Sequence, residues 1–187
     1  MSVGWLTAAD VDELWSDVAH VGQVVPGWRS ALVLADPHGE VEALQRRAAA
    51  WTWSSLDDAP DRWVASELSG YAEEVIRLVG HLVADRRLPA AVMRNVCANR
   101  MAWTLAVHHR LLYETENRLW DVVAERMGPQ WLERQRAAFG IDVSHAESCW
   151  AATDLFAMTA SVVTDVLDPE QQSVVATAVR VAAEGRR

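Results

Sequence analysis

Apolar residues recur at helical spacing near the start of the chain. The apolar positions between residues 11 and 18 repeat with the period of an α-helix. Thr7 stands before this stretch and Asp10 follows three residues later, a pattern typical of a helix cap with an acidic first turn. We expect this first helix to end near His20, because glycine and proline interrupt the pattern between residues 22 and 27.

Residues 28–35 form the best candidate for a β-strand. This WRSALVLA segment is short and apolar, and the turn-forming residues 36–39 (Asp-Pro-His-Gly) follow it. One strand cannot form a sheet alone. The segment must therefore pair with a partner chain or with residues 21–25, or it is not a strand.

From Glu40 onwards the chain has helical patterns separated by proline, glycine and capping residues. The pattern that begins at Pro89 is apolar over so much of its circumference that we expect this helix in the middle of the fold. The predicted helices span residues 40–54, 61–84, 89–115 or further, 129–139, 145–167 and 169–185.

These patterns predict an all-α fold. Helices joined by short loops favour an antiparallel, up-down bundle of about five to seven helices, with one possible short strand near residues 28–35. We assign residues 1–187 to a single domain. Within it, residues 1–39 form the N-terminal helix with the strand and turn, and residues 40–187 form the helical bundle.

Tryptophan dominates the aromatic residues. The 187-residue chain contains ten Trp but only two Tyr and two Phe, so indole rings must supply most of the aromatic burial. Each buried indole also needs a partner for its N–H group. We therefore expect a core that is unusually rich in tryptophan.

The charged residues exclude several functions. The net charge is −9, and every basic residue is an arginine. Nucleic-acid binding requires clustered positive charge, so we expect no nucleic-acid partner. A chain without lysine has neither a Schiff-base lysine nor the lysine of a phosphate-binding loop.

The two cysteines, Cys97 and Cys149, lie in apolar helical patterns, so we expect buried thiols without a disulfide. The sequence shows no signal-peptide pattern and no uncharged apolar segment long enough to cross a membrane. We therefore expect a cytoplasmic protein with no membrane partner.

Two acidic patterns have spacings that occur in metal sites. Residues 57–61 (Asp-Asp-Ala-Pro-Asp) have the spacing of the aspartate-rich motif by which isoprenoid synthases hold magnesium diphosphate. Asn117, Asp121 and Glu125 have the four-residue spacing of a second such motif. The proline in the first pattern favours a loop whose last aspartate caps the next helix. We therefore expect no metal site.

Polar and aromatic residues gather along the second half of the predicted central helix. One side of this helix carries polar groups and an indole ring that could line a pocket between helices. The alternative is that Arg110 pairs with Glu114 on a solvated face and that one histidine is a core residue. The candidate ligand-binding residues are Arg100, Trp103, His108, Arg110, Tyr113, Glu114 and Asn117.

Three segments resemble parts of small antibiotic-type (aminoglycoside- or lincosamide-like) nucleotidyltransferases. Residues 31–44 (ALVLADPHGEVEAL) resemble the last strand and turn of those enzymes. Residues 82–91 (LVADRRLPAA) resemble a link in their C-terminal helical bundle. Residues 111–134, with LLYETENRLW and GPQWLER, resemble the Asn-Arg and Trp-Leu stretch of that bundle. The resemblance covers about residues 30–180.

This resemblance implies the substrate-side helical half of such an enzyme without its catalytic half. Those enzymes share a Gly-Ser turn followed by paired aspartates that hold the metals for nucleotidyl transfer. This chain has no Gly-Ser pair, and nothing before Trp28 supplies an Asp-x-Asp strand. No catalytic residue and no cofactor can therefore be assigned. The chain could be a degenerate relative, a fragment of a longer gene product, or a subunit that borrows a partner.

Three functions are open at this point. The first is a small-molecule-binding helical domain, in which carboxylates and tryptophans hold a cationic ligand. The second is an interaction or structural protein, a homodimer that completes the lone strand or covers an apolar face. The third is an enzyme that acts on an apolar biosynthetic intermediate in a tryptophan-lined pocket.

Overall fold

The computed structural model describes residues 7–187, and every regular element in this part of the chain is helical. The elements are α1 (Ala8–Ser16), α2 (Val21–Ser30), α3 (Glu40–Ala50), the 3₁₀ turn η1 (Trp53–Leu56), α4 (Ala59–Val83), α5 (Arg87–His108), α6 (Glu116–Met127), α7 (Pro129–Ala138), α8 (His145–Val162), the 3₁₀ turn η2 (Thr164–Val166) and α9 (Pro169–Gly185). The predicted all-α class is confirmed, while an up-down order over the whole chain stays a prediction. Among these elements, no helix has both the length and the apolar character that a membrane span requires.

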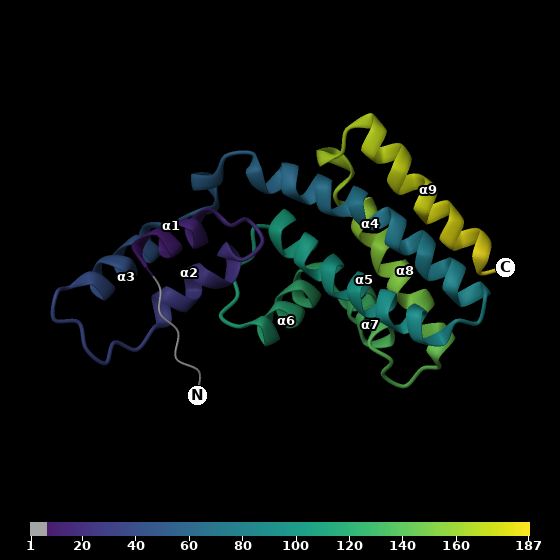
Figure 1. Cartoon of the computed structure of the whole chain (residues 1–187), viewed down its shortest axis with the longest axis horizontal. Helices are drawn as coiled ribbons and strands as arrows, with labels where there is room; N and C mark the ends of the chain where they lie inside the picture. The colour runs from purple at the N-terminus through teal and green to yellow at the C-terminus, as the bar shows by residue number, and fades with distance from the viewer. Residues whose placement is uncertain (1–6) are drawn as a thin grey trace.

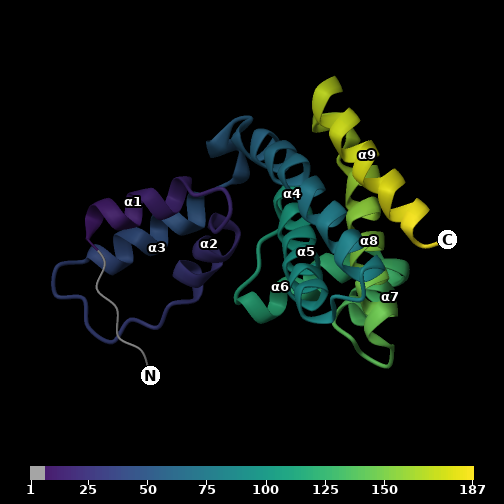
Figure 2. The ribbon, with the colours of Figure 1, turned by 45° about the vertical axis from the view of Figure 1, so that its right-hand side comes forward.

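The helices form two groups (Figure 1). The helices α1, α2 and α3 lie together at one end of the molecule, and α4 to α9 form a larger body that reaches the other end. Within the first group α2 packs against both α1 and α3. Figure 2 shows the same separation from a second direction, with the chain passing from α3 to α4 between the groups. We call residues 7–56 the N-terminal unit.

The N-terminal unit has a small hydrophobic core of its own. Its α3 packs on α2, so α3 belongs with the two preceding helices. The division predicted at residue 39 therefore differs from the packing. Trp53 packs against both this core and the core of the larger body, and so joins them. The buried residues of the small core are Val11, Trp15, Val21, Val25, Ala48 and Trp51.

The helix α5 is central in the larger body, as predicted, and packs against α4, α6, α7 and α8. Small buried residues such as Ala98 and Ala102 let these neighbours approach closely. Within α5, Met101 is fully buried, whereas Val92 near its start is exposed. On α7, the fully buried Trp131 provides a large share of the packing.

The strand predicted for residues 28–35 is wrong, and the predicted end of the first helix is also wrong. α1 ends at Ser16, and a second helix, α2, continues through Pro26 to Ser30. A proline inside a helix leaves the carbonyl four residues earlier without its usual donor. Here that carbonyl belongs to Gly22, and it accepts a hydrogen bond from the Tyr113 N–H at 2.9 Å. A contact distant in sequence therefore satisfies the group that the proline leaves free.

The central helix ends earlier than predicted, at His108 rather than at or beyond residue 115. Arg110 adopts the left-handed conformation with φ 56°. The Arg110 N–H donates to the Val107 carbonyl at 3.0 Å, and the Leu111 N–H donates to the Ala106 carbonyl at 2.8 Å. These two bonds form the Schellman motif that closes a helix. Glycine usually occupies the left-handed position, so an arginine there gave no signal of the helix end.

The helix cap predicted at Thr7 is confirmed, and two further helices begin in the same way. Capping boxes begin α1 at Thr7, α8 at Ser144 and α9 at Asp168. In each case a short side chain accepts a hydrogen bond from the backbone three residues later. The two cysteines, Cys97 and Cys149, are buried free thiols, as predicted.

Candidate functional site

The seven residues predicted to bind a ligand do not share one helix face. Because α5 ends at His108, the later residues lie in the connection to α6 or in α6 itself. Glu114 and Asn117 are exposed. The other five fall into two clusters, one around Arg100 and one around Arg110.

The first cluster lies on α5 and faces α4. The Arg100 guanidinium lies 3.7 Å from a Glu67 carboxylate oxygen and 5.1 Å from the centre of the Trp103 ring. It also lies 5.7 Å from the Tyr71 ring, and burial raises the pKa of the Tyr71 hydroxyl. The His20 ring contacts Trp103 edge-on at 6.1 Å. These contacts occupy the charged group of Arg100, so the cluster joins α5 to α4 and to the N-terminal unit.

The second cluster closes the end of α5. One Arg110 nitrogen donates to the Val107 carbonyl at 2.7 Å, and another donates to the Asp61 carboxylate at 2.6 Å. Arg110 therefore pairs with Asp61 on α4 and not with Glu114. Burial lowers the pKa of His108, and its Nδ1 is buried without a hydrogen-bond partner. Burial also raises the pKa of Tyr113 to about 12, which keeps this hydroxyl protonated.

The aspartate-rich segment also has a structural role. It borders a hollow of about 540 Å³ between the start of α4 and the η2–α9 connection. Asp58 pairs with Arg62, Asp61 pairs with Arg110, and Asp168 caps α9. Asp61 lies in the first turn of α4 and is not its cap, because the helix begins at Ala59. Within residues 7–187 no group of His, Cys, Asp or Glu side chains is arranged to hold a metal ion.

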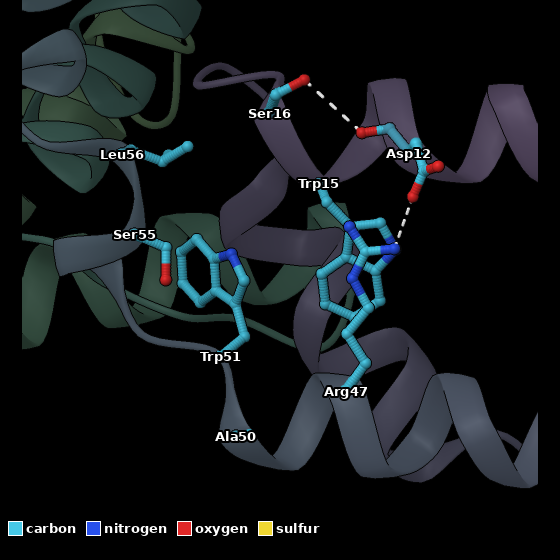
Figure 3. A pocket seen from close by; sticks show the side chains of 8 residues that line it. All are labelled: Asp12, Trp15, Ser16, Arg47, Ala50, Trp51, Ser55 and Leu56. Carbon is cyan, nitrogen blue, oxygen red and sulfur yellow. Dashed lines mark hydrogen bonds and ion pairs between the residues drawn. The ribbon is translucent and has the colours of Figure 1, made fainter.

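A different hollow has the character of a ligand site, and it lies in the N-terminal unit (Figure 3). Its volume is about 440 Å³, and it opens between α1, the end of α3 and η1. Such volumes are typical of small-ligand sites, which combine apolar walls with a few polar groups. Its lining residues are Asp12, Trp15, Ser16, Arg47, Ala50, Trp51, Ser55 and Leu56.

A guanidinium group already occupies part of this hollow. Arg47 extends from α3 towards α1, and its guanidinium carbon lies 4.8 Å from the centre of the Trp15 ring. The same group pairs with Asp12 at 2.5 Å. The Arg47 and Asp12 side chains are 46% and 67% exposed, so both can exchange this partner for another. The hollow therefore combines an indole face with a carboxylate, an arrangement that binds cations.

The walls of this hollow are held in place by contacts beneath it. The Arg29 side chain of α2 donates to the Ala48 carbonyl at 2.9 Å and to the Trp51 carbonyl at 3.1 Å, which fixes the end of α3. Trp51 contacts Trp53 edge-on at 5.3 Å. Trp15 is only 3% exposed, and its Nε1–H is buried without a partner. An unsatisfied buried donor costs stability.

The sequence predicted the burial of Trp15 but not the site around it. Asp12 and Arg47 are 35 residues apart, and their pairing depends on how α1 and α3 both pack on α2. Because we expected a strand over residues 28–35, the packing of α1 and α3 on one common helix was not predicted. The adjacent acidic residues of α1 were a usable signal, because α1 carries no basic residue of its own.

Comparison with protein-family models, with curated proteins and with solved structures finds no match to this chain.

Proposed function

We propose that this protein is a helical domain that binds an organic cation in the hollow of the N-terminal unit, without self-sufficient catalysis. One observation carries the proposal: Arg47 lies over the Trp15 ring while it pairs with Asp12. Arg47 thus stands where the cation of a ligand would bind. The resemblance of residues 82–91 and 111–134 to the substrate-side half of antibiotic nucleotidyltransferases agrees with a domain that binds but does not catalyse, whereas residues 31–35 do not form the strand that this resemblance implies.

The affinity follows from the competition between Arg47 and the ligand. A cation over an indole at an exposed site is worth about 0.5–1 kcal/mol, and an exposed ion pair adds up to about 1 kcal/mol. Arg47 is therefore held in the hollow by about 0.5–2 kcal/mol, which a ligand must overcome. Removal of Arg47 should strengthen cation binding by about two- to thirty-fold.

The test is calorimetric titration with arginine ethyl ester, spermidine and an aminoglycoside. We expect weak binding to the wild-type protein and tighter binding to Arg47→Ala. Arg46→Ala is the matched control, because it removes the same charge one position away, where Arg46 pairs with the exposed Glu42. Asp12→Asn in the Arg47→Ala background should abolish the gain, and Glu13→Gln should not. Equal affinities of the Arg47→Ala and Arg46→Ala proteins would refute the proposal.

A homodimer is a second candidate, favoured by the segment between α2 and α3. Leu32 and Leu34 are 84% and 90% exposed there, and Val33 between them is also exposed. Adjacent exposed apolar side chains are typical of contact surfaces. Sedimentation of wild type as a compact monomer at micromolar concentration would exclude this candidate.

The third function, an enzyme acting on an apolar intermediate, has less support. The hollow that contains two tryptophans is lined by Asp12 and Arg47 as its ionisable groups. Both side chains are substantially exposed and paired with each other, whereas acid–base catalysis usually depends on partly buried groups.

A further inference from the structure

A second hollow lies on the other side of the Arg47–Asp12 pair. It has a volume of about 570 Å³ and shares Arg47 and Asp12 with the first hollow. The two hollows therefore adjoin at this pair, and we call them together the α1/α3 furrow. The residues that line the second hollow are Thr7, Val11, Asp12, Glu40, Ala43, Leu44 and Arg47.

The furrow has two sides, or lips, one on α1 and one on α3. The lining residues on each lip recur at helical spacing. The α1 lip carries Thr7, Val11 and Trp15 at intervals of one turn, and the α3 lip carries residues 40, 43–44, 47 and 50–51. Both helices pack on α2, which lies beneath them. With nine residues, α1 is about 14 Å long. The furrow therefore matches an occupant of about two to three helical turns.

The composition of the furrow suits a helix with one apolar face. Ala43 and Ala50 are exposed on the α3 lip, and their small side chains leave space for a second backbone to approach. Between the lips lie partly buried apolar groups, Leu44 and Leu56. Recognition of an amphipathic helix in an apolar groove depends on these properties.

The charged residues along the rim of the furrow indicate the kind of partner that it would bind. Of the charged residues that line the two hollows, Asp12 and Glu40 are acidic, and Arg47, which pairs with Asp12, is basic. α1 carries two further acidic residues nearby, Asp10 and Glu13, and no basic residue. On the α3 lip, Arg46 is paired with Glu42, so its charge is compensated within α3. The rim is therefore acidic, and electrostatic complementarity favours a basic occupant.

We infer that the α1/α3 furrow binds a basic amphipathic helix of a partner protein, one of whose arginine or lysine side chains takes the place of Arg47 between Trp15 and Asp12. This inference rests on the proposed function and specifies its ligand. The apolar face of the helix covers Leu44 and Leu56, and its basic face lies along α1.

The experiment titrates the wild-type protein with three peptides of about 18 residues, one a basic leucine–arginine amphipathic helix. The second peptide is its scrambled isomer of equal charge, and the third replaces each arginine by glutamate. Tryptophan fluorescence and fluorescence anisotropy report binding. We expect the amphipathic peptide to bind at least tenfold more tightly than either of the others, with affinity that falls as salt is added.

Substitutions on one helix provide the matched control. Ala43→Arg places a large cation inside the furrow and should weaken peptide binding at least tenfold. Ala49→Arg adds the same side chain at an exposed position of α3 that does not line either hollow, and it should leave binding unchanged. Circular dichroism of both variants checks that the fold is retained.

The outcomes separate this inference from the proposed function. If small cations bind but the amphipathic and scrambled peptides bind equally, the helix partner is wrong and the cation site stands. If neither cations nor peptides bind, both the inference and the proposed function are refuted. Equal peptide affinities of the Ala43→Arg and Ala49→Arg proteins, or tight binding of the glutamate peptide, would also overturn the inference.

Discussion

Gly22 lies where α2 meets the segment that follows α5, and a single methyl group at this position tests the contact. A Cβ on Gly22 would lie 3.0 Å from the Leu111 carbonyl oxygen and 3.2 Å from Cε1 of the Tyr113 ring. The Trp53 ring would be 3.5 Å away. The Leu111 oxygen is a backbone atom, so it cannot move without the segment around it.

The magnitude of the effect follows from three contributions. Alanine in place of glycine should favour the helix by about 0.5–1 kcal/mol. Overpacking against the backbone costs about 1–3 kcal/mol. If α2 moves away to relieve the contact, the hydrogen bond from the Tyr113 N–H to the Gly22 carbonyl is weakened, which costs a further 0.5–1.5 kcal/mol, roughly. Gly22→Ala should therefore lower the free energy of unfolding by about 0.5–4 kcal/mol.

Gly27 provides the control within the same helix. A Cβ on Gly27 would meet no atom within 4 Å, so Gly27→Ala gains helix propensity without a clash. We expect this variant to be more stable than wild type by about 0.5–1 kcal/mol. Both substitutions replace glycine by alanine, but their effects on the free energy of unfolding should have opposite signs.

The assay is urea unfolding followed by circular dichroism and by tryptophan fluorescence. Hydrogen exchange of the Tyr113 amide adds a local measurement, because this amide should lose protection in Gly22→Ala and keep it in Gly27→Ala. If Gly22→Ala proves as stabilising as Gly27→Ala, the N-terminal unit does not dock on the larger body through this contact, and the reasoning is refuted.

Two further predictions concern the larger body. The Trp131 Nε1–H donates to the Gln135 Oε1 at 2.8 Å, and both residues are buried, so Trp131→Phe should destabilise by about 2–4 kcal/mol through a cavity and an unsatisfied amide. Urea unfolding measures this loss, and adding Gln135→Leu should recover part of it. Burial lowers the pKa of His109 to about 4, so the folded state binds its proton less readily than the unfolded state does. Stability should therefore fall as the pH drops from about 6.5 towards 4, and His109→Asn should show a smaller loss over the same range in unfolding curves at pH 7 and pH 5.

The features that the sequence predicted depend on nearby residues. The caps at Thr7, Ser144 and Asp168 need partners only three residues away, so their patterns could be recognised directly. The central position of α5 follows from its own composition. The end of α5 could not be recognised, because Arg110 adopts a conformation for which arginine has little preference.

The seven candidate residues are not brought together, for a related reason. A helix continuing beyond His108 would have aligned Glu114 and Asn117 with Arg100, but the chain turns away and leaves both exposed. The Asp12–Arg47 pair depends instead on two helices brought together by α2. The acidic residues of α1 indicate that a basic partner lies on another helix, but no pattern within either helix identifies Arg47 as that partner.

Pro26 has a consequence for how the two parts of the molecule stay attached. The Gly22 carbonyl can accept from Tyr113 without competition, because position 26 has no amide proton to offer. Any other residue at position 26 would supply a rival donor from within the helix. Proline is usually regarded as a helix breaker, but here it leaves the Gly22 carbonyl free to bind a distant segment. Replacing Pro26 would add a hydrogen bond within α2 and weaken the attachment between the two parts of the molecule.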